Sequence, residues 1–154
     1  INAILSHIIG TEDEAKNIEC IQVTFHVHLP PQIEKFGEPV VVGSCRELGR
    51  WIMVTILLTQ PSKREHPTYW RSHPIEISLG EGEIKYKYGS FNRSKGRVEY
   101  EGEGGKHTRT LDTRTNDQYD IWQNNKSLYI VDISDFAFVK CIYNAVNTTN
   151  FKDK

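Results

Sequence analysis

The stretch that most constrains the fold is a run of strictly alternating side chains from Ile21 to Leu29. Every second residue in it is apolar, and the residues between are Gln22, Thr24, His26 and His28. Because successive side chains of a β-strand point to opposite faces, this alternation predicts a strand with one buried and one exposed face. His26 and His28 project from the same face and could bind a metal ion together, but no third ligand is spaced beside them. We therefore interpret them as two exposed strand residues. No metal site is therefore expected.

Further short strand-like segments follow, with no strong helix signal between them. Pro30 and Pro31 end the first strand, and a β-branched strand follows at Val40–Val42. Turns containing Gly, Ser, Asn or Pro separate the remaining predicted strands, at about 69–79, 84–88, 97–101, 108–112 and 128–132. Many short strands without intervening helices predict an all-β fold, either a sandwich or a barrel.

The two ends of the chain differ from this strand-rich middle. Residues 1–18 combine an apolar cluster with an acidic run, and we interpret them as a flank or linker. After Ser134, a candidate N-cap, apolar residues recur at helical spacing, so residues 133–154 are expected to form a C-terminal flank with a short amphipathic helix. The predicted organisation is a single domain over residues 19–132 between these two flanks.

Charge and composition exclude some classes of partner. The chain has 19 Lys and Arg against 20 Asp and Glu, so it has no electrostatic footprint for nucleic acid or an anionic membrane. Its longest apolar stretch, Trp51–Leu58, is far shorter than the roughly 18 to 20 residues of a membrane-spanning helix. No membrane span is expected.

Two further features concern the origin of the chain. It opens at Ile1 with neither an initiator methionine nor a signal peptide, so we expect it to be covalently part of a larger polypeptide. Three cysteines, an odd number, favour reduced thiols and an intracellular, cytoplasmic location. Three glycosylation sequons favour the alternative, a secreted protein, and they begin at Asn92, Asn125 and Asn147.

Motifs for catalysis and cofactor binding are incomplete. The glycine-rich segment Gly102–Lys106 lacks the opening Gly of a phosphate loop, and His107 stands where a Ser or Thr would hold magnesium. No cysteine has the arginine that a phosphatase loop places six residues later, and no nucleophile elbow is present. Glutamates are numerous enough for a glycosidase pair, but we interpret most of them as solvated charges. We therefore expect no enzymatic activity, no catalytic residue and no cofactor.

Five sequence blocks follow one another over about Val23 to Thr113. They are the opening strand, FGEPVVVGSCRELGRW, TYW, EIKYKYG and GRVEYEGEGGKHTR. In this order they resemble carbohydrate-binding module family 20, the starch-binding domains, and the last block is worded most like the laforin-type module. The resemblance implies an antiparallel, immunoglobulin-like β-sandwich without catalytic activity. Such a module would bind α-1,4-glucan of starch or glycogen type, as polysaccharide or maltooligosaccharide, and recruit a larger parent protein to it.

Aromatic rings outside the core are what such a module needs, because indole and phenol planes cover the apolar C–H faces of pyranose rings. By the resemblance, Trp51 is the first stacking platform, and Lys87 is the lysine that contacts sugar. Tyr100 is the second platform, where the family usually has tryptophan. Glu101 is expected to accept a sugar hydroxyl or to hold Lys87. The alternatives are a core tryptophan at 51, a solvated strand lysine at 87 and an exposed strand charge at 101.

A candidate second glucan site rests on Phe36, which matches an aromatic position of glucoamylase modules, and on Tyr69. Trp70 matches the buried tryptophan of the family, and we interpret it as a core residue. The loop after Tyr100 lacks the asparagine of glucoamylase-type members. These departures leave a second hypothesis open, a protein-interaction sandwich in a large regulatory protein that has kept the fold and lost glucan binding.

Overall fold

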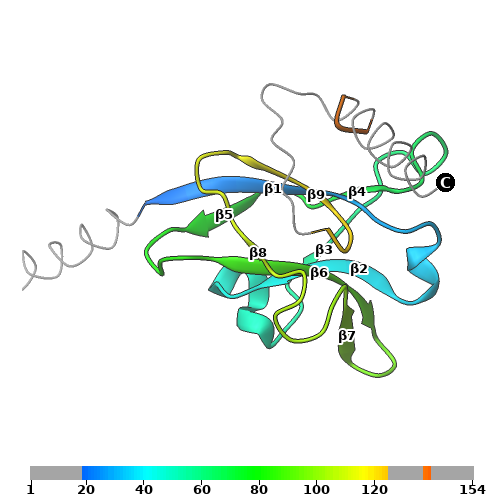
Figure 1. Ribbon diagram of the computed structural model, residues 1–154, viewed down its shortest axis with the longest axis horizontal. Coiled ribbons are helices and arrows are strands. Elements are labelled where there is room, and N and C mark those ends of the chain that lie inside the picture. Colours follow the sequence, from blue (N-terminus) through cyan, green and yellow to red (C-terminus); the bar gives the residue numbers. More distant parts are fainter. Residues whose placement is uncertain (1–18, 125–136, 140–154) are drawn as a thin grey trace, which may run out of the picture.

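The computed structural model describes residues 19–124 and 137–139 of the chain. The described part forms two facing sheets (Figure 1). Its elements in chain order are β1 (Cys20–His28), η1 (Ile33–Lys35), β2 (Glu38–Gly43), η2 (Arg46–Trp51), β3 (Ile56–Leu57), β4 (Tyr69–Arg71), β5 (Ile75–Ser78), β6 (Lys85–Asn92), β7 (Arg97–Tyr100), β8 (Arg109–Thr110) and β9 (Asp117–Ile121). Residues 137–139 are helical. The predicted all-β sandwich with a short C-terminal helix is confirmed.

One sheet is built on β1 and the other on β2 and β6. Strand β1 pairs antiparallel with β4 and β5, and parallel with β9. The second sheet has the order β3-β2-β6-β7, and β8 pairs with β6 as well. All of its pairs are antiparallel. Strand β7 pairs with β6 alone among the described strands, so it forms an edge of this sheet.

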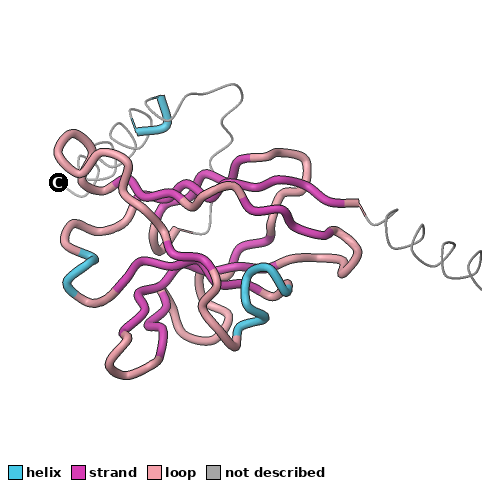
Figure 2. Tube along the Cα trace, turned by 180° about the vertical axis from the view of Figure 1, so that it is seen from behind, coloured by secondary structure: helices cyan, strands magenta, loops and turns pink. Residues whose placement is uncertain are grey.

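The core lies between the two sheets, which Figure 2 shows as two layers from behind. Val23, Phe25 and Val27 of β1 are fully buried, as the alternation predicts. They pack against the aromatic rings of β6. The Phe25 ring of β1 and the Tyr86 ring of β6 lie edge to face with centroids 4.9 Å apart. Trp70 also belongs to this core and is 8% exposed, which agrees with its interpretation as a core residue.

The predicted strand 69–79 is two strands in the structure. Its first part, β4, pairs with the C-terminal half of β1, and its second part, β5, pairs with the N-terminal half. Between them Ser72 Oγ accepts a hydrogen bond from the Phe25 amide at 2.9 Å. Strand β9 was not predicted, and the predicted strand at 128–132 lies outside the described residues.

The second face of β1 is covered at His26, although Gln22 on the same face is exposed. His26 is 3% exposed, and its ring stacks on Tyr119 with centroids 4.5 Å apart. Its nitrogens are hydrogen-bonded to the Tyr69 hydroxyl at 2.7 Å and to the Asp117 carboxylate at 2.8 Å. The buried ring of Phe138 packs against the same group. The prediction of an exposed His26 is therefore wrong, because residues remote in sequence cover this face.

Two classes of feature are missing from the described ranges 19–124 and 137–139. In these ranges no three His, Cys, Asp or Glu side chains are grouped so that they could hold a metal ion. No helix within them is long and apolar enough to cross a membrane.

Candidate functional site

Trp51 ends η2 in a turn with an unusual backbone. Gly49, Arg50 and Trp51 all have left-handed φ angles, of 89°, 51° and 62°. Such angles are uncommon for residues other than glycine, and they cluster at functional sites. The exposed Arg50 guanidinium donates a hydrogen bond to the Glu81 carboxylate at 2.7 Å. The turn leaves the Trp51 indole 40% exposed, so Trp51 is not a core residue.

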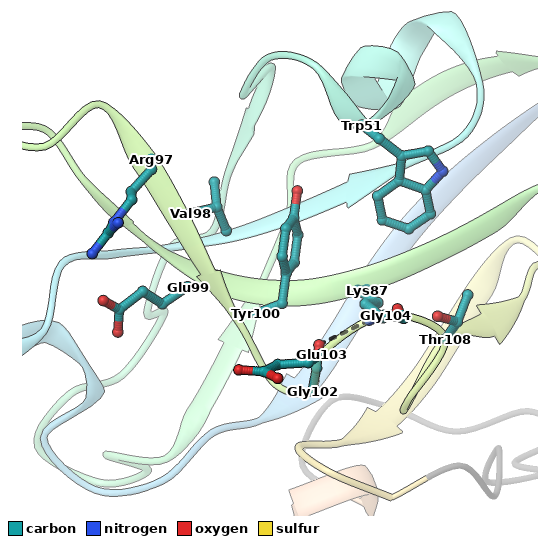
Figure 3. Close-up of a pocket in the computed structure, with 10 residues that line it drawn as sticks. All are labelled: Trp51, Lys87, Arg97, Val98, Glu99, Tyr100, Gly102, Glu103, Gly104 and Thr108. Atoms are coloured by element: carbon teal, nitrogen blue, oxygen red, sulfur yellow. Dashed lines mark hydrogen bonds between the residues drawn. The ribbon is translucent and has the colours of Figure 1, made fainter.

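The Trp51 indole faces the ring of Tyr100, which ends β7. The two centroids are 6.1 Å apart and the planes are inclined by 74°, an edge-to-face arrangement. Beside the rings lies a groove of about 660 Å³ (Figure 3). Its lining consists of these two rings together with Lys87, Arg97, Val98, Glu99, Gly102, Glu103, Gly104 and Thr108. The structure thus brings together three of the residues that the sequence singled out.

Lys87 lies on β6 at the inner wall of this groove. The residue is only 4% exposed, and its ammonium donates hydrogen bonds to the carbonyls of Gly102, at 2.8 Å, and of Gly104. The nitrogen is 5.7 Å from the centroid of the Tyr100 ring, within cation–π range. Burial lowers the pKa of the Lys87 ammonium, and the charge of Glu101 opposes this shift. An ammonium has three donors, so two carbonyls leave one N–H for the groove. Lys87 is not the solvated strand lysine of the alternative interpretation.

Glu101 does not line the groove, although it follows Tyr100 directly. Its side chain is fully buried and forms a two-pronged ion pair with Arg109, with Nη2 donating to Oε2 at 2.9 Å. The same carboxylate accepts the backbone N–H groups of Tyr88, at 3.1 Å, and Gln123, at 2.7 Å. The predictions of a sugar contact and of an exposed charge at Glu101 are both contradicted. A neighbouring cation and two amides bury this carboxylate, and they come from three other parts of the chain.

Four polar residues that line the groove were not predicted from the sequence. Arg97 and Glu99 belong to β7, and both line the groove because it follows the sheet edge that β7 forms. Glu103 and Thr108 belong to the loop after β7. The sequence signal that could have found this loop is its glycine content. A Cβ on Gly102 would lie 2.7 Å from the His107 ring, so the loop folds back too tightly for any side chain there.

A second depression, of about 530 Å³, surrounds Phe36. The Phe36 ring is 68% exposed and shares the depression with Leu57 and Trp70. The Trp70 Nε1–H is buried and has no hydrogen-bond acceptor among the residues that the structure describes. An indole N–H is a donor and nearly always finds a partner when it is buried.

Tyr69 does not belong to this second depression. It is 4% exposed, and its hydroxyl is bonded to His26 on the outer face of the β1 sheet. Adjacent strand residues point to opposite faces, so Tyr69 faces away from the core that Trp70 enters. The prediction that Tyr69 contributes to a second glucan site is therefore wrong.

Comparison with known proteins identifies the family of this chain. The family model described as starch binding domain matches residues 20–122. The chain belongs to the starch-binding domain family. The resemblance found in the sequence blocks is thereby confirmed, and domains of this family are non-catalytic binding modules.

Two solved structures share the fold of this starch-binding domain. A family 15 glucoamylase from Hypocrea jecorina is 22% identical with a TM-score of 0.50, and the match covers 68% of this chain and 17% of the enzyme. A glucoamylase from Hormoconis resinae is 20% identical with a TM-score of 0.50, covering 71% of this chain and 19% of the enzyme. The chain thus spans less than a fifth of either enzyme. No curated protein sequence matches it.

Proposed function

We propose that this starch-binding domain binds α-1,4-glucan chains of starch or glycogen type in the groove between Trp51 and Tyr100. The pair of rings inclined at 74° over the groove is the observation that carries the proposal. Rings cover the apolar C–H faces of pyranoses. An α-glucan curves, so neighbouring sugars present their faces in different directions. Two inclined rings can therefore each take one sugar of the same chain.

The polar lining of the groove suits a neutral ligand. Besides the two aromatic residues, two acidic, two basic and one hydroxyl side chain line it, namely Glu99, Glu103, Arg97, Lys87 and Thr108. The acids accept hydrogen bonds from sugar hydroxyls, and the bases donate to hydroxyl oxygens. Their charges balance within the groove, so it has no excess positive charge that would favour a polyanion.

The expected affinity of a single groove is modest. Two or three stacked and hydrogen-bonded sugars correspond to about −5 to −7 kcal/mol, hence dissociation constants of about 10 µM to 0.2 mM. A polysaccharide presents many equivalent chains, so weak sites gain through multivalency when several occur on one protein or assembly. We infer that the domain recruits a larger polypeptide to polysaccharide.

The depression around Phe36 supports a second glucan site within the same proposal. Its exposed phenyl ring offers a stacking surface of the kind that pyranose faces cover. Two sites on one domain would let it cross-link neighbouring glucan chains.

Titration of the domain with β-cyclodextrin, maltoheptaose and glycogen tests the proposed function. Binding by the parent protein and its loss in Trp51→Ala would support the groove. The matched control is Ile52→Ala, because Ile52 is 83% exposed, follows Trp51 in the chain and does not line the groove. Absence of binding to all three glucans would refute the proposal and favour the protein-interaction alternative. Incubation with maltoheptaose should release no reducing ends, and turnover that follows the purified domain would contradict a pure binding role.

A further inference from the structure

Arg109 is a buried arginine that binds Glu101, the residue just before the loop that lines the groove. Its side chain is 1% exposed and binds both oxygens of the Glu101 carboxylate. The guanidinium also donates to the carbonyls of Ile121, at 2.7 Å, and Asn124, at 2.9 Å, where the chain leaves β9. Its Nε lies 3.4 Å from Asp120 Oδ1, an ion pair without a hydrogen bond.

We propose that Arg109 is a positioning residue for glucan binding. Through Glu101 it fixes the Gly102–Gly104 wall of the groove, and it does not itself touch the sugar. The inference rests on the proposed function for the effect on affinity, whereas the effect on the loop can be measured without any ligand.

Glu101 is the link between Arg109 and the groove, because it is held through both its side chain and its backbone. Its N–H donates to the Tyr88 carbonyl at 3.1 Å, and its own carbonyl accepts the Gln123 side-chain amide at 3.0 Å. The residues on either side of it, Tyr100 and Gly102, both line the groove. Fixing Glu101 therefore fixes the start of the loop and the end of the strand that carries the second ring.

The loop has a second anchor on its other side. Lys87 holds the carbonyls of Gly102 and Gly104, so the wall is clamped between Lys87 and the Glu101–Arg109 pair. A wall that is already ordered before the ligand arrives loses little conformational entropy on binding. Loosening the Arg109 anchor should therefore weaken binding, although Arg109 itself makes no contact with the sugar.

Arg109→Lys is the informative substitution. The Arg109 guanidinium makes two hydrogen bonds to the Glu101 carboxylate and one to each of the two carbonyls, whereas an ammonium presents only three donors from a single point and cannot make all four bonds. The charge is kept, so Glu101 and Asp120 remain compensated. Removing the cation altogether would leave these two buried carboxylates without it, a change that is strongly destabilising.

The experiment compares Arg109→Lys with the parent protein and with Arg114→Lys as a matched control. Arg114 also pairs with a carboxylate, that of Asp112, but its side chain is 75% exposed and does not line the groove. In Arg109→Lys we expect the amides of residues 102–106 to exchange about tenfold faster while those of β1 keep their protection. We expect the dissociation constant for β-cyclodextrin to rise roughly 3- to 10-fold. The control should change neither quantity.

A double-mutant cycle with Lys87→Met separates positioning from general destabilisation. Both residues hold the same wall, so the loss of affinity in the double variant should be smaller than the product of the single losses. Independent effects that multiply would overturn the proposal. So would parental affinity in Arg109→Lys, or a uniform rise of exchange across the domain.

Glu101→Gln keeps the proposal testable if Arg109→Lys fails to fold. It preserves the side-chain shape and removes the two-pronged ion pair, and we expect the same local loosening and weaker binding. Parental exchange at residues 102–106 in this variant would overturn the positioning role. If the parent protein binds none of the α-glucans, the proposed function fails, and loop exchange alone then decides whether Arg109 positions the wall.

Discussion

Replacing Trp51 with alanine should remove most of the affinity of the groove. The indole is 40% exposed in the absence of ligand. A fully covered indole buries up to about 250 Å², so about 100 Å² of Trp51 remains available for a sugar. At about 25 cal/mol per Å² this area contributes about 2.5 kcal/mol, which is about 70-fold in dissociation constant.

The assay is isothermal titration of Trp51→Ala and Ile52→Ala with β-cyclodextrin, together with thermal unfolding of both variants. Ile52→Ala removes a more exposed apolar side chain next to Trp51, so it controls for general loss of surface hydrophobicity. The fold should survive in both, because the Trp51 ring contacts the Tyr100 ring and lies outside the main core.

Two results would refute this reasoning. A folded Trp51→Ala variant with parental affinity would show that the indole does not stack on sugar. An equal loss of affinity in Ile52→Ala would show that the apolar turn, and not the groove, holds the ligand.

Three further predictions concern other parts of the domain. Tyr100→Trp should enlarge the stacking area and tighten β-cyclodextrin binding about two- to fivefold, and Tyr100→Ala should weaken it; parental titrations for both would place Tyr100 outside the site. Phe36→Ala should lower the number of cyclodextrin molecules bound per domain while the Trp51 groove keeps its affinity; an unchanged stoichiometry would exclude the second site. Burial lowers the pKa of His28 from its usual 6.5. The His28 imidazole therefore takes up its proton less readily in the folded state than in the unfolded state. The stability that neutral His28 contributes above pH 6.5 is lost as the pH falls from 6.5 through the lower pKa of the folded state. In urea unfolding between pH 7 and pH 5, His28→Gln should therefore lose less stability than the parent, and equal losses would contradict this assignment.

The parts of the site that could be predicted from the sequence are those encoded locally. The Gly-Arg turn before Trp51 and the alternation around Lys87 and Tyr100 lie in short sequence blocks, and the structure brings these three residues to one groove. The Trp51 and Tyr100 rings both reach the groove because of their immediate neighbours along the chain. The turn before Trp51 has left-handed backbone angles, and Tyr100 ends a strand at a sheet edge.

Polar residues of the site were harder to predict, because burial of a charge depends on distant partners. The sequence pattern around Glu101 is that of an exposed strand charge, but in the structure Arg109 and the Gln123 amide bind its carboxylate. The two glutamates that do line the groove, Glu99 and Glu103, lie two residues before and two residues after it, so the sequence pattern does not distinguish the three.

The alternation at residues 21–29 determined that β1 has two faces, and it identified the face that enters the core. Only the tertiary structure decided what covers the second face. Asp117, which is hydrogen-bonded to His26, is 91 residues away along the chain, and the buried ring of Phe138 lies still further along it. Periodicity records the direction in which a side chain points, whereas its exposure depends on which other segments pack against it.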